Sequence, residues 1–388
     1  MNKIQRVIWI VLDSAGMGAM PDADEFGDAG SNTIGNTSKA VGGLDVINMR
    51  KMGLGNIDGM VGVEPVANPV GMYGRLGEIS RGKDTTVGHW EMVGIETTKP
   101  FPVYPDGFPE DVIRAFIEAT GVPGILGNCA ASGTEIIAIL GDEHVRSRKP
   151  IVYTSADSVF QVACHESVYS PEELYKMCEA ARKILTGDHE VARVIARPFV
   201  GGHGQYTRTS NRRDFSIQPD PKNLLVEMKD AGLDVVGVGK IEDIFDHVGI
   251  TKAVHTKDNM DGVDVTLKFM DEEIKGLIFT NLVEFDAKWG HRNDFEGYAR
   301  GLEDFDRRLP EIVDSMRSED LLIITADHGC DPTTASTDHS REYVPLLVYG
   351  KWMSEGVNLG TGKSFANIGQ TLAKIFGLRP LAIGESFL

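Results

Sequence analysis

Three apolar segments of the sequence each end in an aspartate that could bind a metal ion. These aspartates are Asp13, Asp286 and Asp327. A segment that is apolar along almost its whole length predicts a parallel strand covered on both faces. Because the carboxyl ends of parallel strands meet at one edge of a sheet, we expect the three carboxylates to lie close together. An aspartate after a strand is also common as a turn or helix cap, so each one alone is a weak signal.

Three histidines stand close behind these carboxylates. His328 is adjacent to Asp327, His291 follows Asp286 across a short segment, and His339 lies further along in Thr-Asp-His. Carboxylate and imidazole ligands without thiolates suit Mn²⁺, Zn²⁺, Mg²⁺ or Fe²⁺. Six ligands are too many for one catalytic ion that keeps an open position. They suit two ions about 3.5–4 Å apart, an arrangement that serves phosphoryl transfer.

The segment 82–90 is the candidate source of a nucleophile. It combines glycines with a lysine, an aspartate, Thr85, Thr86 and a histidine in one turn-like stretch. A surface loop is the plain alternative. Beside metal ions either threonine becomes a candidate, because a hydroxyl is a poor nucleophile until a base or a metal lowers its pKa.

The elements that must position these residues divide into two regions. A chain of 388 residues exceeds one simple core, so we expect two domains. Before residue 100 we expect a strand over 7–12 and a loop with short helical pieces over 21–60, and strands and helices alternate after Pro219. A proline-rich crossing and a change of character mark 101–217. That middle region contains five arginines and no acidic residue between 193 and 213. Such a run is either a solvated face or a phosphate site.

Composition limits the classes of partner and compartment. The formal net charge of −18 argues against non-specific binding to nucleic acid or to an anionic membrane. The four cysteines form no CxxC pair, and the apolar run near the N-terminus is too short for a signal peptide or membrane helix. We therefore expect a cytoplasmic protein that acts on small molecules, and predict no protein partner.

Five motifs together resemble the prokaryotic phosphopentomutases, a family of the alkaline-phosphatase-like metalloenzyme superfamily. The similarity extends over nearly the whole chain, including the segments 132–135 and 153–158. Asp-His-Gly at 327–329 marks only the superfamily, whereas the middle segments and the Thr85 motif indicate the mutase. The five motifs are Val11-Leu12-Asp13-Ser14, Gly82-Lys83-Asp84-Thr85, Asp286-x4-His291, Ala326-Asp327-His328-Gly329 and Thr337-Asp338-His339.

The resemblance implies an α/β fold in which a mostly parallel sheet flanked by helices carries an inserted α+β cap domain. The discontinuous core would span 1–100 and 218–388, and the cap 101–217. Two Mn²⁺ ions are implied, the first held by Asp13, Asp327 and His328, the second by Asp286, His291 and His339. Thr85 would carry the phosphoryl group. The residues that would contact the sugar phosphate are Ser155, Asp157, Arg193, Arg208 and Lys240.

The implied reaction interconverts ribose 1-phosphate and ribose 5-phosphate, or their deoxyribose counterparts, through a sugar bisphosphate. A bisphosphate such as glucose 1,6-bisphosphate would prime the threonine, and the reaction would link nucleoside breakdown to pentose phosphate metabolism. The alternative is a metal-dependent phosphohydrolase or a phosphoglycerate mutase on the same core. Two residues depart from the family pattern: Val87 replaces a hydroxyl residue, and Cys330 stands where asparagine is common. Cys330 would place a thiol beside the ions.

Overall fold

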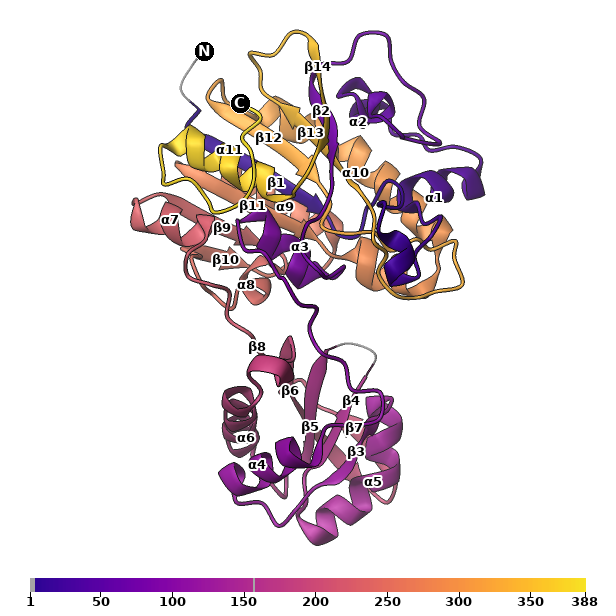
Figure 1. The fold of residues 1–388 in the computed structure, drawn as a ribbon, viewed down its shortest axis with the longest axis vertical. Helices are drawn as coiled ribbons and strands as arrows, with labels where there is room; N and C mark the ends of the chain where they lie inside the picture. Colours follow the sequence, from indigo (N-terminus) through magenta and orange to yellow (C-terminus); the bar gives the residue numbers. More distant parts are fainter. Residues whose placement is uncertain (1–3, 156–157) are drawn as a thin grey trace. The chain divides into compact units, whose positions relative to one another are not determined.

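The chain folds as two compact units in a computed structural model that describes residues 4–155 and 158–388. The first, here the core unit, comprises residues up to Lys99 together with Pro219–Leu388. The second, here the insert unit, is the continuous stretch Pro100–Gln218 (Figure 1). The insert unit therefore interrupts the core unit in sequence at a single place.

The core unit is built on a mostly parallel sheet that has eight strands among the described residues, in the order β10-β9-β11-β1-β12-β13-β2-β14 (Figure 1). Only β13 runs antiparallel to its two neighbours. The strands are β1 (Arg6–Leu12), β2 (Gly71–Leu76), β9 (Asp234–Val238), β10 (Lys252–Val254), β11 (Gly276–Leu282), β12 (Asp320–Thr325), β13 (Val344–Tyr349) and β14 (Gly356–Gly362).

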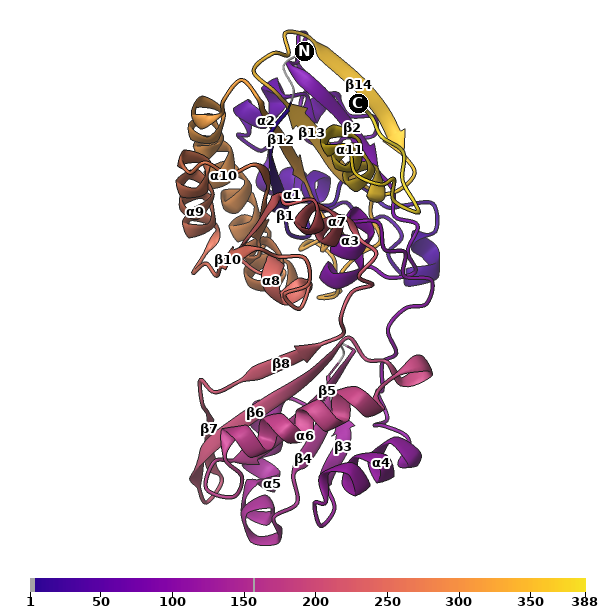
Figure 2. The same cartoon turned by 90° about the vertical axis from the view of Figure 1, so that its left-hand side faces the viewer.

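Helices cover both faces of this sheet (Figures 1 and 2). On one face α10 packs against α1, α2 and α9, and on the other α11 packs against α3 and α7, with α8 beside α3. The helices are α1 (Thr33–Val41), α2 (Ile47–Lys51), α3 (Thr85–Met92), α7 (Leu224–Asp230), α8 (Ile241–Ile244), α9 (Asn259–Asp271), α10 (Phe295–Ser315) and α11 (Ala366–Phe376). Short 3-10 turns lie at Ala23–Phe26 and Leu54–Asn56.

The central strands are buried from end to end because both faces are covered. Every residue of β1, β11 and β12 is buried, and Trp9 of β1 stacks on Phe279 of β11 with ring centroids 4.5 Å apart. At the amino ends of β1 and β12, Arg6 and Asp320 form a buried ion pair of 2.6 Å. Parallel pairing of β1 with both neighbours brings the carboxyl ends of all three strands to the same edge.

The insert unit is an α+β structure around a second sheet, ordered β3-β4-β5-β6-β7, with β8 paired to β6. Helices α4 and α6 cover one apolar cluster of this unit, and α5 covers another. Its elements are β3 (Leu126–Ala130), β4 (Ile151–Thr154), β5 (Val159–His165), β6 (Arg193–Gly202), β7 (Gln205–Arg208), β8 (Arg213–Ser216), α4 (Glu110–Thr120), α5 (Gly133–Ser147), α6 (Pro171–Ile184) and a 3-10 turn at Gly187–His189.

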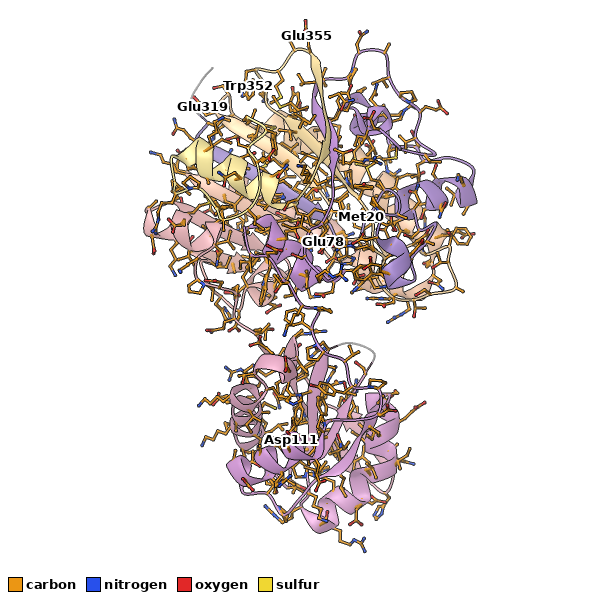
Figure 3. The ribbon with its side chains drawn as sticks, viewed as in Figure 1. Met20, Glu78, Asp111, Glu319, Trp352 and Glu355 are labelled. Atoms are coloured by element: carbon orange, nitrogen blue, oxygen red, sulfur yellow. The ribbon has the colours of Figure 1, made fainter. Side chains whose placement is uncertain are left out.

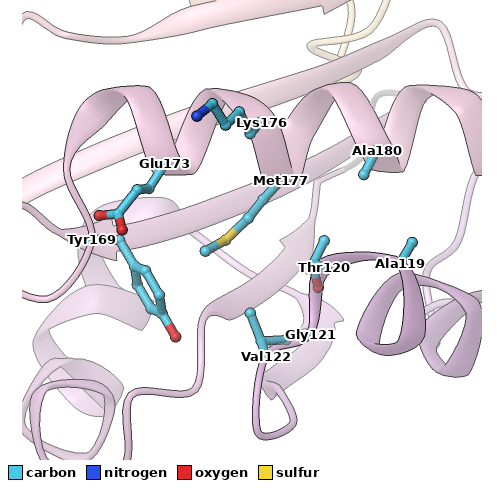
Figure 4. Close-up of a pocket in the computed structure, with 9 residues that line it drawn as sticks. All are labelled: Ala119, Thr120, Gly121, Val122, Tyr169, Glu173, Lys176, Met177 and Ala180. Atoms are coloured by element: carbon cyan, nitrogen blue, oxygen red, sulfur yellow. The ribbon is translucent and has the colours of Figure 1, made fainter.

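A shallow groove of about 300 Å³ runs between α6 and the end of α4 (Figure 4). Met177 of α6 extends toward Val122 on its floor, and Glu173 and Lys176 lie on the same helix at its edge. The groove brings together no cluster of metal ligands or nucleophiles.

The α/β class with an inserted α+β unit is confirmed, and two local predictions need correction. The strand that we expected to end at Asp286 ends at Leu282, and Asp286 lies instead on a π-helical turn, Phe285–Trp289. The segment 82–90 is only partly a loop, because α3 begins at Thr85. The Asp84 side chain starts that helix by accepting hydrogen bonds from the backbone N–H groups of Thr86 and Val87.

Across the described parts of the chain, we find no helix with the length and apolar character needed to cross a bilayer.

Candidate metal centre and active site

One group of potential ligands lies where β1 and β12 end. Asp13 follows β1, and Asp327 and His328 follow β12. His328 Nε2 lies 3.4 Å from Asp13 Oδ1 and 3.4 Å from Asp327 Oδ2. One ligand atom from each of the three side chains fits within a span of 4.8 Å, and all three side chains are buried. The spacing suits a single ion held by two carboxylates and one imidazole.

A second group centres on Asp286. Its Oδ2 lies 3.2 Å from His291 Nε2, and its Oδ1 lies 3.3 Å from His339 Nε2. His291 belongs to a 3-10 turn, Gly290–Arg292, that directly follows the π-helical turn. Within a 4.8 Å span Asp286 combines with His328 and His339, and separately with His291 and Cys330. Asp286 is therefore the carboxylate that both of these ligand sets share.

The buried oxygens of this site are short of hydrogen-bond donors. Neither Asp13 Oδ1 nor Asp286 Oδ1 has a hydrogen-bond partner among the described residues, although both residues are buried. The nearest histidine nitrogens are His328 Nε2, 3.4 Å from Asp13 Oδ1, and His339 Nε2, 3.3 Å from Asp286 Oδ1. Leaving buried carboxylate oxygens without partners is costly, and bound cations remove that cost. The oxygen and nitrogen donors present thus fit divalent ions.

Burial and neighbouring charges shift the pKa values of the site residues, and the direction differs from one residue to the next. Burial, reinforced by the carboxylate of Asp327, raises the pKa of Asp13. Despite its burial, the neighbouring histidines hold the pKa of Asp286 well below its usual value. Asp286 and then the Cys330 sulfur raise the pKa of His291 to about 11. Burial opposes charge on His328, yet Asp327 and Asp13 raise its pKa well above its usual value. The carboxylates thus create a potential that attracts cations.

Thr85 lies at the start of α3, facing this site. Its Oγ1 is 3.2 Å from His328 Nε2, and the residue is 7% exposed. The helix approaches the end of β12 very closely: a Cβ at Gly88 would overlap the backbone carbonyl oxygen of Asp327. Glycine at this position therefore lets α3 place a hydroxyl against the ligands. Thr86, the other candidate, lies at the next position of α3, and no hydrogen bond joins it to the ligands among the described residues.

Neighbouring side chains hold the ligands in place. His89 Nδ1 lies 3.1 Å from Asp327 Oδ2 and 2.8 Å from the carbonyl oxygen of Thr85. Asn281 donates a hydrogen bond of 2.8 Å to Asp13 Oδ2. The backbone N–H of Ser14 donates to Asp327 Oδ1 at 2.9 Å, and Ser14 has a left-handed φ of 71°. Such strain is typical of functional sites.

Arg341 ties the His339 segment to the loop before Thr85. Its Nη1 donates to the carbonyl oxygens of Ser80 and Gly82, each at 2.8 Å, and to Glu78 Oε2 at 2.7 Å. Glu78 and Arg341 are both almost fully buried, and Figure 3 labels Glu78 next to Met20, whose sulfur accepts the Glu78 backbone N–H. A planar guanidinium with several simultaneous acceptors fixes both segments at once.

The predicted arginine patch forms a pocket in the insert unit, with a volume of about 360 Å³. Arg208 Nη2 donates to the Tyr153 hydroxyl at 3.2 Å, while Arg208 Nε has no hydrogen-bond partner among the described residues. A Cβ at Gly133, the first residue of α5, would overlap the Arg208 guanidinium. The pocket is lined by Ala131, Ser132, Gly133, Ser155, Val159, Gln161, Arg193, Ile195, Arg197, Arg208 and Arg212.

The predicted substrate contacts divide between the two units. Ser155, Arg193 and Arg208 line this pocket. Lys240 lies in the core unit, where it is the N-cap of α8 and is half-buried. Asp157 lies outside the described residues.

Comparisons with known proteins identify the family. A model of the Metalloenzyme superfamily matches residues 5–380. Phosphopentomutase from Clostridium novyi (strain NT) is 63% identical over 99% of this chain and 98% of its own length. Phosphopentomutase from Acetivibrio thermocellus is 59% identical over 99% of both chains. The chain belongs to the phosphopentomutase family. Among solved structures, a Leishmania mexicana phosphoglycerate mutase aligns at a TM-score of 0.49, with 12% identity over 99% of this chain and 97% of that one.

Membership confirms the resemblance and the enzyme class expected from the sequence, an isomerase that transfers a phosphoryl group. The match to the Metalloenzyme superfamily, together with the clustered carboxylates and imidazoles, indicates a metalloenzyme whose site suits divalent ions.

Sequence reasoning missed several supporting residues of this phosphopentomutase-family site. His89 and Asn281 were not predicted to contact the ligands, because neither follows a strand end in a ligand-like pattern. Only their positions could have indicated this role. Asn281 lies near the end of β11, and His89 lies one helical turn after Thr85, with its ring against the Thr85 carbonyl.

Proposed function

We propose that this protein interconverts (deoxy)ribose 1-phosphate and (deoxy)ribose 5-phosphate, with Thr85 as the carrier of the phosphoryl group. The observation that carries the proposal is the position of Thr85 Oγ1, 3.2 Å from His328 Nε2 at the edge of two buried ligand groups. High identity to phosphopentomutases over the whole chain supports the choice of pentose phosphates as substrates.

We assign one Mn²⁺ to Asp13, Asp327 and His328, and a second to Asp286, His291 and His339. When bound, the ions would lower the pKa of the Thr85 hydroxyl and neutralise charge on the transferring phosphoryl group. His328 can serve as a ligand through Nε2, because its Nδ1 lies 3.0 Å from the Gly329 carbonyl oxygen and can donate a proton there. Asn281 and His89 keep the two carboxylates of the first set in place.

The reaction begins with phosphothreonine at position 85, formed from a sugar bisphosphate such as glucose 1,6-bisphosphate. The phosphoryl group passes from Thr85 to the 5-hydroxyl of ribose 1-phosphate, whose proton is lost, to give a ribose bisphosphate. The bond between the 1-oxygen and its phosphorus then breaks as the Thr85 oxygen attacks that phosphorus. Ribose 5-phosphate leaves and phosphothreonine is restored. Positioning and charge neutralisation provide most of the catalysis in such transfers.

The arginine pocket of the insert unit would hold the phosphate that is not reacting. The unpartnered Arg208 Nε and the neighbouring Arg193 offer the fork geometry that phosphate oxygens accept. We propose that Ser155, Asp157 and Lys240 contact the sugar phosphate as well. In this view 1–100 and 218–388 are the phosphotransfer core and 101–217 is a substrate-binding cap. The cap would also shield the phosphothreonine from water.

A phosphohydrolase or a phosphoglycerate mutase on the same core remains the alternative. A hydrolase would release inorganic phosphate from phosphothreonine, and a phosphoglycerate mutase would ignore pentoses. We place the reaction in the cytoplasm, a reducing compartment that is compatible with four free thiols.

A coupled assay tests the proposal. Ribose 5-phosphate should appear from ribose 1-phosphate without an equivalent amount of free phosphate, and mass spectrometry should find phosphate on Thr85 after exposure to glucose 1,6-bisphosphate. Thr85→Ala should abolish both signals, whereas Thr86→Ala, which alters the adjacent threonine, should keep them. Phosphate release that matches or exceeds isomerisation would show that the enzyme is a hydrolase.

A further inference from the structure

Cys330 is a thiol packed directly against the turns that carry Asp286 and His291. The residue is 1% exposed and lies two positions after His328. A Cβ on Gly290, the first residue of the second turn, would come within 2.9 Å of the Cys330 sulfur. The thiol also contacts the Asp338 carbonyl oxygen at 3.6 Å. The sulfur therefore lies inside the ligand cluster rather than behind it.

Cys330 completes a ligand set of its own. Its Sγ, a nitrogen of His291 and an oxygen of Asp286 all lie within 4.8 Å of one another. The Asp286 side chain also points to a cation in this cluster: it is 4% exposed, and its Oδ1, which lies 3.3 Å from His339 Nε2, has no hydrogen-bond partner among the described residues. A buried thiol alone would be unremarkable, because free cysteines are often core residues.

We propose that Asp286, His291 and Cys330 form a mixed oxygen, nitrogen and sulfur site that selects a thiophilic divalent ion, such as Zn²⁺ or Co²⁺, over Mn²⁺. Thiolates favour zinc-like ions, whereas manganese prefers carboxylate and water ligands. On binding, the sulfur–metal bond forms and the thiol proton is released to solvent. The inference extends the proposed metal centre, because Asp286 and His291 are shared with the second Mn²⁺ set.

Sharing these ligands has a consequence for the enzyme. An ion bound through Cys330 occupies Asp286 and His291, so it competes with the ion that we assign to Asp286, His291 and His339. We therefore expect Zn²⁺ to displace Mn²⁺ at this position and to reduce turnover, and Cys330→Ser to weaken that inhibition.

Cobalt provides a direct spectroscopic test on the full-length protein. After metal removal with a chelator and addition of Co²⁺, wild-type protein should show a thiolate-to-cobalt charge-transfer band in the near ultraviolet. Cys330→Ser should lose the band. Cys129→Ser, which removes an exposed thiol of the insert unit, should keep it. No band in the wild type, or a band that survives in Cys330→Ser, would overturn the proposal.

X-ray absorption at the zinc edge tests sulfur ligation in the wild-type protein, so its result does not depend on whether Cys330→Ser folds. With one equivalent of Zn²⁺, the wild-type protein should show a sulfur neighbour at about 2.3 Å beside nitrogen and oxygen at about 2.0–2.2 Å. A shell of nitrogen and oxygen alone would refute sulfur ligation. In equilibrium competition, Cys330→Ser should lower Zn²⁺ affinity by about tenfold or more while changing Mn²⁺ affinity far less.

These readouts are independent of turnover. Failure of the mutase assay would leave the cobalt band and the zinc–sulfur distance unaffected. Conversely, an active mutase with no sulfur ligation would refute only this inference.

Discussion

The ligand cluster of the core unit and the arginine pocket of the insert unit gather side chains of opposite charge. The cluster gathers buried carboxylates, three of whose oxygens have no hydrogen-bond partner among the described residues, so bound cations would stabilise it. The pocket gathers four arginines around an open space, and two of them, Arg193 and Arg212, pair with Asp214, so the pocket can accept an anion. A doubly charged phosphate ester and divalent ions are the complementary charges. The difference explains how a chain with net charge −18 can bind phosphorylated substrates.

The two sites also differ in how they are built. The ligands of the cluster come from the ends of buried strands and adjoining turns and are supported by buried side chains such as Asn281. The arginines of the pocket extend from β6, β7 and the following loop, and their surroundings are more exposed. A rigid framework suits ions that must be held at fixed separations, whereas adjustable side chains suit the phosphate group of a sugar phosphate.

The largest expected effect comes from removing the shared carboxylate of the core. Asp286→Asn should lower kcat on the order of 10³-fold, because it removes charge stabilisation where the phosphoryl group transfers. Metal analysis should show that less than the full complement of ions is bound. Asp271→Asn, at an exposed position near the end of α9, is the matched control and should behave as the wild type. Full activity and metal content in Asp286→Asn would show that the cluster does not depend on this residue.

The next largest effect is that chelation should change the stability of the core unit but not that of the insert unit. With Mn²⁺ at 100 times its dissociation constant, the core unit should gain about 2.7 kcal/mol of stability, which EDTA removes. Hydrogen exchange should detect this loss in peptides from β1, β11 and β12. Peptides from β5 and β6 serve as the internal control and should exchange at an unchanged rate. An equal change in both units would contradict the assignment of the ions to the core.

A change in the pocket should affect binding rather than metal content. Arg208→Gln should raise KM by about tenfold to hundredfold, the range expected from losing a hydrogen bond to a charged group. Steady-state kinetics would measure this, with bound Mn²⁺ unchanged. The control is Arg146→Gln, because Arg146 is exposed on α5 of the same unit. If KM stays constant in Arg208→Gln, the pocket does not hold the phosphate.

The smallest effect concerns acid stability of the insert unit. Burial lowers the pKa of His144 below its ordinary 6.5. Its Nδ1 lies 2.7 Å from the Lys149 carbonyl oxygen, and its Nε2 accepts the His165 N–H. The unfolded chain therefore binds the proton first as pH falls below 6.5. The unit should lose at most about 1.4 kcal/mol of stability per pH unit below that value, and none above it.

Urea denaturation monitored in the insert unit between pH 7 and 5 would measure this dependence. His144→Gln should flatten the curve, and His203→Gln, at an exposed position, should leave it as it is. A steep pH dependence in His144→Gln would mean that another group is responsible.

Much of the metal site in the core unit could be predicted from the sequence, because several of the ligands follow the ends of strands. Uninterrupted apolar runs predict β1 and β12, and parallel pairing then brings Asp13 and Asp327 together. The π-helical turn that carries Asp286 was not predictable in this way, since it depends on how the turn packs after β11. The same holds for His89, whose contact with Asp327 exists only because Gly88 lets α3 approach β12. In the pocket, the arginine run was visible, but its arrangement around the start of α5 was not.

The interrupted sequence of the core unit has a consequence for synthesis. Pro100–Gln218 is continuous, so its sheet has all its partners once that stretch has emerged from the ribosome. The first metal set, in contrast, joins Asp13 to residues 327 and 328, and β1 must wait for both of its neighbours, β11 and β12. The nascent chain thus carries an apolar, unpaired β1 through most of translation. All six proposed ligands are present only after His339 has emerged, so a chain that binds ions in both sets has already synthesised every strand of the sheet except β13 and β14.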